Sequence, residues 1–307
     1  MIMRVLLIGG NGFIGSHLVD VFVEGGASVR VLDRKPEAFR PPVAGVEYVV
    51  GDALDAAVVR KALIGVDSVI HLASTTVPAT SNLDPANDII SNLVPMVRLL
   101  EVMREVGVRN VLFLSSGGTV YGIPETDPVN EGHPLRPLSS YGIVKVAIEK
   151  YLYMESRLHG LRYTVLRASN PYGPRQGHMG LQGVIGTYLW RLARGESVEV
   201  WGDGSVVRDF IHVRDLAELC ALAITAQFSG VFNAGSGDGV SISQILPVIS
   251  EVVGRPIVPV YKPGRGFDVP RVVLDIGKAK KAFDWSPRIG LTAGIAEAWV
   301  WVRKQQA

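Results

Sequence analysis

The chain has 307 residues, of which 48% are hydrophobic, and 31 Lys and Arg residues against 29 Asp and Glu give it a formal net charge of +2. The basic residues are scattered, which excludes the concentrated positive charge typical of nucleic-acid-binding proteins. No stretch is apolar over the length of a membrane span, and no cleavable signal precedes the first apolar run. We expect a cytoplasmic α/β protein with neither nucleic acid nor a membrane as a partner. The only cysteine, Cys220, is expected to be a buried, inert thiol.

The first predicted elements are a strand, a glycine turn and a helix. Residues 3–8 are an unbroken apolar run, as in parallel strands that are buried on both faces, and the sequence GGNGFIG follows at 9–15. Glycines at such a turn let the backbone approach a pyrophosphate at the helix N-terminus. The spacing G-x-x-G-x-x-G differs from the commoner G-x-G-x-x-G, so glycines that only form a tight turn are the alternative interpretation.

The second strand indicates which dinucleotide binds. Residues 28–32 are the second predicted strand, which ends at Asp33, about where an acidic side chain accepts hydrogen bonds from an adenosine ribose. Arg34 could recognise a 2′-phosphate, but the carboxylate of Asp33 would repel that group. The pattern therefore favours NAD over NADP.

Further along the chain, strand-like runs alternate with helical patterns. The runs are residues 46–50, 68–72, 111–114 and 163–166, and the helical segments include 89–106 and 141–159. This alternation predicts a Rossmann-type, doubly wound parallel sheet that binds ligands at the carboxyl ends of its strands.

After Arg167, Pro and Gly become frequent, which predicts a smaller C-terminal α/β lobe that binds substrate. We expect an NAD-binding domain at 1–167 plus about 207–235, and a nucleotide-sugar-binding lobe at 168–206 and 236–307. Ser241 and Gln244 are predicted to form a capping box at the start of a helix.

Tyr141 and Lys145 are the main candidates for chemistry. Four residues apart on a helix, they would lie on one face. A tyrosine acts as a base near neutral pH only if its pKa falls by about three units, and a cation about 4 Å away supplies about that much energy. We therefore expect Lys145 to make Tyr141 a base. An exposed aromatic beside a solvated charge is the alternative that the spacing alone leaves open.

These features together resemble the extended short-chain dehydrogenases/reductases of the nucleotide-sugar epimerase/dehydratase group. The resemblance covers nearly the whole chain. The matching segments are GGNGFIG (9–15), Asp33, GDALD (51–55), HLAS (71–74), Asn92, SSGGTVYG (115–122), YGIVK (141–145), NPYGP (170–174), WGDGSVVRDFIHV (201–213) and the R-x-x-D of 265–268.

The resemblance implies three sets of site residues and no metal ligand. The expected NAD contacts are Gly9, Gly12, Phe13, Ile14, Asp33, Arg34, Asp52, Ala53, Leu72, Ala73, Ser74, Asn92, Ser115, Tyr141 and Lys145. The expected catalytic residues are Tyr141, Lys145, Ser116 and Thr119. The expected substrate contacts are Ser116, Gly117, Gly118, Thr119, Tyr141, Asn170, Arg208, Arg265 and Asp268, with the two arginines on the diphosphate.

One position departs from the family pattern. Many relatives carry Ser or Thr where this chain has Gly117, so the hydroxyl that contacts the reacting oxygen must come from Ser116 or Thr119. Relatives that dehydrate or decarboxylate the sugar carry an acid in the places of Gly117 and Gly118. Neither glycine can donate a proton, so the resemblance implies epimerisation.

The leading hypothesis is a UDP-sugar 4-epimerase that works through a 4-keto intermediate. Its NAD would be tightly bound and regenerated in each cycle, and its substrate would be UDP-glucose/galactose or a 2-N-acetyl or 6-carboxylate variant. A keto-sugar reductase and a non-catalytic dinucleotide-binding protein on the same fold are the alternatives. The resemblance also implies a homodimer through the helices at 89–106 and 141–159.

Overall fold

The structure is a computed structural model that describes residues 2–177, 183–226, 228–264 and 269–306. The chain forms two compact units, each with its own hydrophobic core. The first unit comprises Met1–Val120, Pro137–Arg167 and Ala217–Phe232. The second comprises Tyr121–Arg136, Ala168–Leu216 and Asn233–Ala307.

A seven-stranded sheet in the order β10-β6-β5-β4-β1-β2-β3 is the centre of the first unit. The pairs β1–β2, β1–β4, β2–β3 and β4–β5 are parallel. The strands are β1 (Arg4–Ile8), β2 (Ser28–Asp33), β3 (Glu47–Val50), β4 (Ser68–His71), β5 (Asn110–Ser116), β6 (Arg162–Ala168) and β10 (Gly230–Ala234). The strands β1, β4 and β5 are largely buried, whereas β3 at the edge of the sheet is half-buried to exposed. The predicted doubly wound sheet is confirmed.

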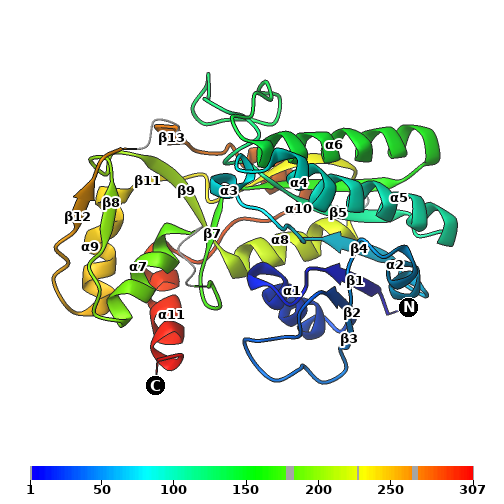
Figure 1. The fold of residues 1–307 in the computed structure, drawn as a ribbon, viewed down its shortest axis with the longest axis horizontal. Coiled ribbons are helices and arrows are strands. Elements are labelled where there is room, and N and C mark those ends of the chain that lie inside the picture. Colours follow the sequence, from blue (N-terminus) through cyan, green and yellow to red (C-terminus); the bar gives the residue numbers. More distant parts are fainter. Residues whose placement is uncertain (1, 178–182, 227, 265–268, 307) are drawn as a thin grey trace. The chain divides into compact units, whose positions relative to one another are not determined.

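Helices cover both faces of this sheet. They are α1 (Phe13–Glu24), α2 (Ala56–Leu63), α3 (Pro78–Ser81), α4 (Pro85–Asp88), η1 (Ile89–Leu93), α5 (Val94–Val106), α6 (Ser140–His159) and α8 (Val213–Thr225). Apolar side chains of α2, α5 and α6 form one core with the strands, and α1 lies on the opposite side of the sheet (Figure 1). Ser139 caps α6 by accepting a hydrogen bond from the Gly142 N–H, and Gly160 ends the helix in the left-handed conformation.

The predicted helix at 89–106 is regular only from Val94 onward. Its first part, η1, is a wide π-helical turn. Pro95 explains the irregularity, because it lacks the N–H that would bond to the carbonyl of Ser91 one turn earlier. The wide turn buries the side chain of Asn92.

The second unit is built from small sheets and packed helices. Its strands are β7 (Asn170–Tyr172), β8 (Glu199–Trp201), β9 (Val207–His212), β11 (Gly239–Ser241), β12 (Val260–Lys262) and β13 (Arg271–Val272). Its helices are α7 (Val184–Ala193), α9 (Ile242–Val253), α10 (Gly277–Phe283) and α11 (Leu291–Lys304). The capping box of Ser241 and Gln244 is confirmed at the start of α9.

The limits of the units differ from the predicted ranges at two places. We expected the chain to return to the first domain at about 207, but β9 pairs with β7, β11 and β13, so the return covers only Ala217–Phe232. The segment Tyr121–Arg136 belongs to the second unit because Asn233 binds it, donating its Nδ2 to the carbonyl of Val129 at 2.9 Å. Which ligand each unit binds stays a prediction at this stage.

Two expectations from composition concern this fold. Throughout residues 2–177, 183–226, 228–264 and 269–306, no helix combines the length and the apolar character needed to cross a bilayer. Cys220 is buried in α8, and burial raises the pKa of its thiol to about 12, so the prediction of an inert cysteine is confirmed. The cytoplasmic location stays a prediction.

Candidate active site

The glycine turn after β1 leaves no room for side chains. Gly9 has a φ of 83°, and a Cβ there would lie 2.8 Å from the backbone nitrogen of Ala73. A Cβ at Gly15 would lie 2.5 Å from the Cα of Gly10. Gly12 begins α1 without a side-chain cap, so no side chain of the cap residue covers the first turn of the helix. This bare cradle fits the pyrophosphate of a dinucleotide.

Two carboxylates stand at the carboxyl ends of neighbouring strands. Asp33 ends β2, and its oxygens accept hydrogen bonds from the backbone N–H groups of Asn11 and Lys35 at 3.1 and 3.2 Å. Asp52 follows β3, and its Oδ1 accepts from the Leu54 N–H at 2.9 Å. Both side chains remain half-buried, and Arg34 is exposed. Carboxylates at this edge can accept hydrogen bonds from a ribose, and their contact with NAD stays a prediction.

The segment after β4 is ordered by Asn92. Its Oδ1 accepts a hydrogen bond from the Thr75 N–H at 2.8 Å, and its Nδ2 donates to Oδ1 of Asp88 at 2.8 Å. Asn92 thus uses both ends of its amide within the chain, so its contact with NAD stays a prediction. The other expected NAD contacts here are half-buried or exposed: Leu72, Ala73 and Ser74.

The structure brings Tyr141 and Lys145 together on the first turns of α6. The Lys145 Nζ lies 5.3 Å from the centre of the Tyr141 ring and 4.6 Å from that of Phe113. The same Nζ donates a hydrogen bond to the carbonyl of Leu114 at 3.0 Å, so the ammonium has a fixed position. Lys145 is buried, which contradicts the alternative of a solvated charge.

The expected effect of Lys145 on Tyr141 is wrong for the chain alone. Burial, and after it the negative charge of Asp88, raise the pKa of Tyr141 to about 12. Burial also lowers the pKa of Lys145 to about 8, against the carboxylates of Glu149 and Asp88, which raise it. Helical spacing predicted the proximity of the pair but not the cost of burying a phenolate.

Glu149, on the next turn of α6, forms a buried ion pair with Arg167, and its negative charge raises the pKa of Lys145. Arg167 binds Glu149 with two nitrogens, Nη2 to Oε2 at 2.6 Å and Nε to Oε1 at 3.1 Å. Ser115 donates its hydroxyl to the same Oε1 at 2.7 Å, so this side chain contacts Glu149, and its contact with NAD stays a prediction. Our sequence analysis missed Glu149 and Arg167. The position of Glu149, four residues after Lys145 on the same helical face, could have indicated the first of them.

The two candidate hydroxyls differ in their surroundings. Thr119 is half-buried, and its carbonyl would lie 3.0 Å from a Cβ at Gly142, the residue after Tyr141. Ser116 ends β5 and is also half-buried. A Cβ at Gly118 would meet no atom within 4 Å, so space remains there.

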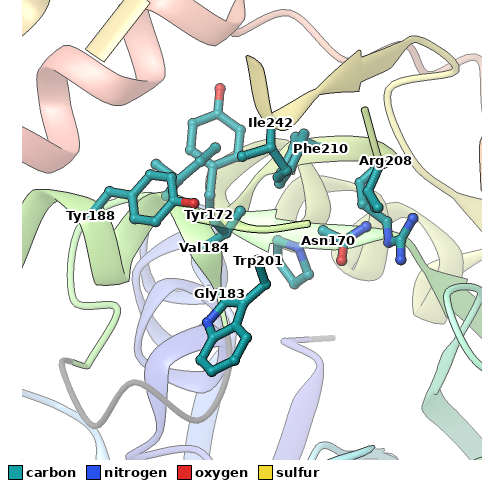
Figure 2. A pocket seen from close by; sticks show the side chains of 12 residues that line it. Asn170, Tyr172, Gly183, Val184, Tyr188, Trp201, Arg208, Phe210 and Ile242 are labelled. Atoms are coloured by element: carbon teal, nitrogen blue, oxygen red, sulfur yellow. The ribbon is translucent and has the colours of Figure 1, made fainter. Parts of the chain in front are cut away.

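The second unit contains a pocket of its own (Figure 2). It is lined by Asn170, Pro171, Tyr172, Gly183, Val184, Ile185, Tyr188, Trp201, Val206, Arg208, Phe210 and Ile242. Asn170 and Arg208 lie toward one side of it and the ring of Tyr188 toward the other (Figure 2). The structure thus places two predicted substrate residues in one pocket. Arg265 and Asp268, predicted for the same ligand, lie outside the described residues.

Backbone contacts hold the polar groups of this pocket in place. The Nη1 of Arg208 donates to the carbonyls of Val207 and Val269 at 2.9 and 2.7 Å, and the Nδ2 of Asn170 donates to the carbonyl of Asp209 at 2.8 Å. The cavity volume is about 220 Å³, smaller than a pocket that encloses a drug-sized ligand. Planar aromatic walls beside a guanidinium suit part of a nucleotide, such as a base with its phosphate.

Residues 5–235 match the sequence profile of the NAD dependent epimerase/dehydratase family. Solved structures agree with this match. A UDP-glucose 4-epimerase from Thermotoga maritima, solved with UDP-glucose, is 36% identical with a TM-score of 0.95, over 99% of this chain and 100% of that one. The UDP-glucose 4-epimerase of Thermus thermophilus, in complex with NAD, is 35% identical with a TM-score of 0.91, over 98% of this chain and 99% of that one.

A third solved structure has a different substrate in its name. It is the UDP-N-acetylglucosamine 4-epimerase from Methanobrevibacter ruminantium in complex with UDP-N-acetylmuramic acid. It is 28% identical to this chain with a TM-score of 0.93, and the match covers 99% of both chains. Proteins of similar fold are thus named with UDP-sugars whose C2 substituents differ in size.

Proposed function

The chain belongs to the NAD-dependent epimerase/dehydratase family, and from this premise we propose that it inverts C4 of a UDP-sugar through a 4-keto intermediate. The observation that carries the proposal is the pair of Tyr141 and buried Lys145 in the same unit as a glycine turn that fits a dinucleotide. When bound, NAD accepts a hydride from the sugar carbon and later returns it. The reaction is therefore an isomerisation without net consumption of NAD.

Tyr141 and Lys145 have different roles in this reaction. Tyr141 accepts the proton of the C4 hydroxyl as the carbon is oxidised and gives it back when the ketone is reduced. Lys145 supplies positive charge near the phenol from a position that the Leu114 carbonyl fixes. The sugar must turn over between the two half-reactions so that the hydride returns to its other face.

A substrate with a diphosphate suits the pocket of the second unit. A guanidinium presents planar, paired donors to phosphate oxygens, and Arg208 lines this pocket with Asn170. We propose that Arg208 binds the diphosphate, together with Arg265 as the family resemblance implies. Because the substrate would be bound through its diphosphate, the sugar ring would remain free to rotate.

The glycines at 117 and 118 favour epimerisation over loss of water. Dehydration of a keto-sugar requires an additional acid, and neither glycine carries one. The open space at Gly118 also leaves room for a larger sugar, such as one with an N-acetyl group at C2 or a carboxylate at C6. UDP-glucose is the first substrate to test, and these two variants follow.

A single assay tests the proposed function. Purified protein, without added cofactor, is incubated with UDP-glucose, UDP-N-acetylglucosamine or UDP-glucuronate, and NMR follows the configuration at C4. We expect inversion of at least one of them. Turnover that instead requires stoichiometric NADH or NADPH would identify a keto-sugar reductase, and no reaction with any sugar would reject the epimerase.

Strand geometry favours Thr119 over Ser116 as the source of the hydroxyl that Gly117 lacks. Phe113 and Ser115 face α6, since they contact Lys145 and Glu149, so alternation along β5 directs Ser116 to the opposite face. Thr119 packs its backbone against the residue that follows Tyr141. We therefore propose that Thr119 contacts the reacting oxygen.

Replacement of Thr119 by valine, which has the same shape, tests this assignment. We expect kcat to fall by about tenfold to a hundredfold, the effect of one lost hydrogen bond to a developing charge. Ser116→Ala is the matched comparison, and steady-state kinetics with both variants decides. A larger loss with Ser116→Ala would reverse the assignment.

An exposed apolar stripe on α6 supports the proposal of a homodimer. Ile143, Tyr151, Met154 and Leu158 are exposed and spaced so that they share one face of the helix. Ile90, just before α5, is exposed as well, and α5 packs beside α6. A second copy of the chain would bury this face by two-fold symmetry.

Light scattering of the purified protein tests the dimer directly. We expect twice the mass of one chain for the native protein and a shift toward the single-chain mass for Leu158→Glu, because a buried carboxylate opposes association. Val258→Glu changes a side chain that is 83% exposed in the second unit and is the control. A native mass of one chain would reject the homodimer.

A further inference from the structure

The carboxylate of Asp88 is fully buried directly before η1, at the end of α4. Its relative exposure is 0%, and its oxygens accept hydrogen bonds from three side chains in different parts of the chain. Thr76 Oγ1 donates at 2.6 Å and Asn92 Nδ2 at 2.8 Å to Oδ1, while Ser140 Oγ donates at 2.7 Å to Oδ2. An isolated buried charge would be costly, so this set of donors is what allows the carboxylate to be there.

These hydrogen bonds fix the start of the helix that carries Tyr141. Ser140 is the first residue of α6, and its backbone N–H also donates to Oδ1 of Asn82 at 2.8 Å. Through Asn92 and Thr76, Asp88 is connected to the segment that follows β4. One carboxylate therefore joins the N-terminal turn of α6 to the loop where NAD contacts are expected.

Asp88 also acts on the charges around the phenol. It raises the pKa of Tyr141 in addition to burial, and it raises the pKa of Lys145, as Glu149 does. His71, at the end of β4, is affected by the charge of Lys145. Burial and then Lys145 lower the pKa of His71 to about 3, so His71 is neutral near pH 7. Asp88 and Lys145 are thus charged groups that act on or lie near Tyr141, and Glu149 acts on Lys145.

We propose that Asp88 is a positioning residue for Tyr141: it accepts a hydrogen bond from the hydroxyl of Ser140, the residue before Tyr141, and so holds the N-terminal turn of α6 in place and sets a negative charge near the phenol. The inference rests on the proposed role of Tyr141 as the base. It adds an opposing charge to the pair of Tyr141 and Lys145.

The substitution Asp88→Asn separates charge from shape. The amide oxygen can accept from Thr76 and Asn92, and the amide nitrogen can donate to Ser140, whose hydroxyl turns to accept. We expect Tyr141 to ionise about one pH unit lower than in the native protein, because one neighbouring negative charge is lost. The readout is the NMR resonance of ζ-carbon-labelled tyrosine in the protein as purified, assigned with Tyr141→Phe.

Asp84→Asn is the matched control. Asp84 lies four residues earlier, is exposed and caps α4 with its carboxylate, so the same change there should leave the resonance of Tyr141 unmoved. An unchanged or more alkaline ionisation in Asp88→Asn would overturn the electrostatic part of the proposal. This result does not depend on turnover, so it stands apart from success or failure of the epimerase assay.

A second variant tests the positioning part and remains informative if Asp88→Asn does not fold. Ser140→Ala removes the hydrogen bond to Asp88 but leaves the charge in place. We expect kcat to fall at least severalfold with KM and the ionisation of Tyr141 little changed. Native kcat in Ser140→Ala would show that the tether does not position Tyr141.

Discussion

Replacement of Tyr141 by phenylalanine is expected to lower kcat by about a thousandfold while bound NAD is retained. The phenol oxygen is the group that takes and returns the proton of the C4 hydroxyl, and general acid–base groups contribute about 10²- to 10⁴-fold to rates. The ring itself remains, so its packing beside Lys145 is unchanged. Steady-state kinetics gives kcat, and the absorbance of the purified protein gives its NAD content.

The control for this substitution lies on the same helix. Tyr153 is 55% exposed on α6, so Tyr153→Phe removes a phenol oxygen that has no place in the mechanism. It should leave kcat within about twofold of the native value, well below the loss expected from one catalytic acid–base group. Near-native turnover in Tyr141→Phe would reject the proton transfer, and loss of NAD with loss of turnover would indicate a damaged cofactor site instead.

The sheet was predictable because its strands are local patterns. An unbroken apolar run such as residues 5–8 has few stable alternatives to a strand that is buried on both faces. The limits of the two units were harder, since they depend on contacts between distant residues. Val129 bridges to Leu274, and neither position carries a local pattern that indicates the pairing.

The parts of the site that a sequence motif determines were predictable. The positions of buried charged side chains were less so, because they depend on contacts between distant residues. The glycine turn and Asp33 follow from spacing, and the structure places them as expected. Asp88 was missed because an acidic residue in a short helix usually faces solvent. Its buried hydrogen bond to Ser140 joins residues 52 positions apart.

The pair of Tyr141 and Lys145 was likewise predictable in its spacing but not in its burial. Four-residue spacing correctly predicted that the two side chains are neighbours. It could not show that Lys145 is buried and Tyr141 half-buried, nor that Asp88 adds a negative charge. Desolvation and then Asp88 raise the pKa of Tyr141 to about 12. The base is thus a property of the whole charged site rather than of two residues. The charges next to Lys145 therefore matter for stability as well as for chemistry.

Replacement of Arg167 by methionine is expected to lower the free energy of unfolding by about 3–5 kcal/mol, because the carboxylate of Glu149 would remain buried without its bidentate partner. Both side chains of the pair are 4% exposed, so water cannot replace the guanidinium. Denaturant unfolding of the native and variant proteins measures the loss.

Two further variants separate the buried charge from the loss of packing. Arg60→Met breaks an ion pair with Glu105 in which both side chains are about half exposed, and it should cost less than about 1 kcal/mol. In Arg167→Met combined with Glu149→Leu, the carboxylate that lost its partner is removed, so at least half of the lost stability should return. If the double variant is as unstable as Arg167→Met alone, packing rather than the unpaired carboxylate causes the loss. Recovery would show that the carboxylate of Glu149, left without Arg167, causes the loss of stability.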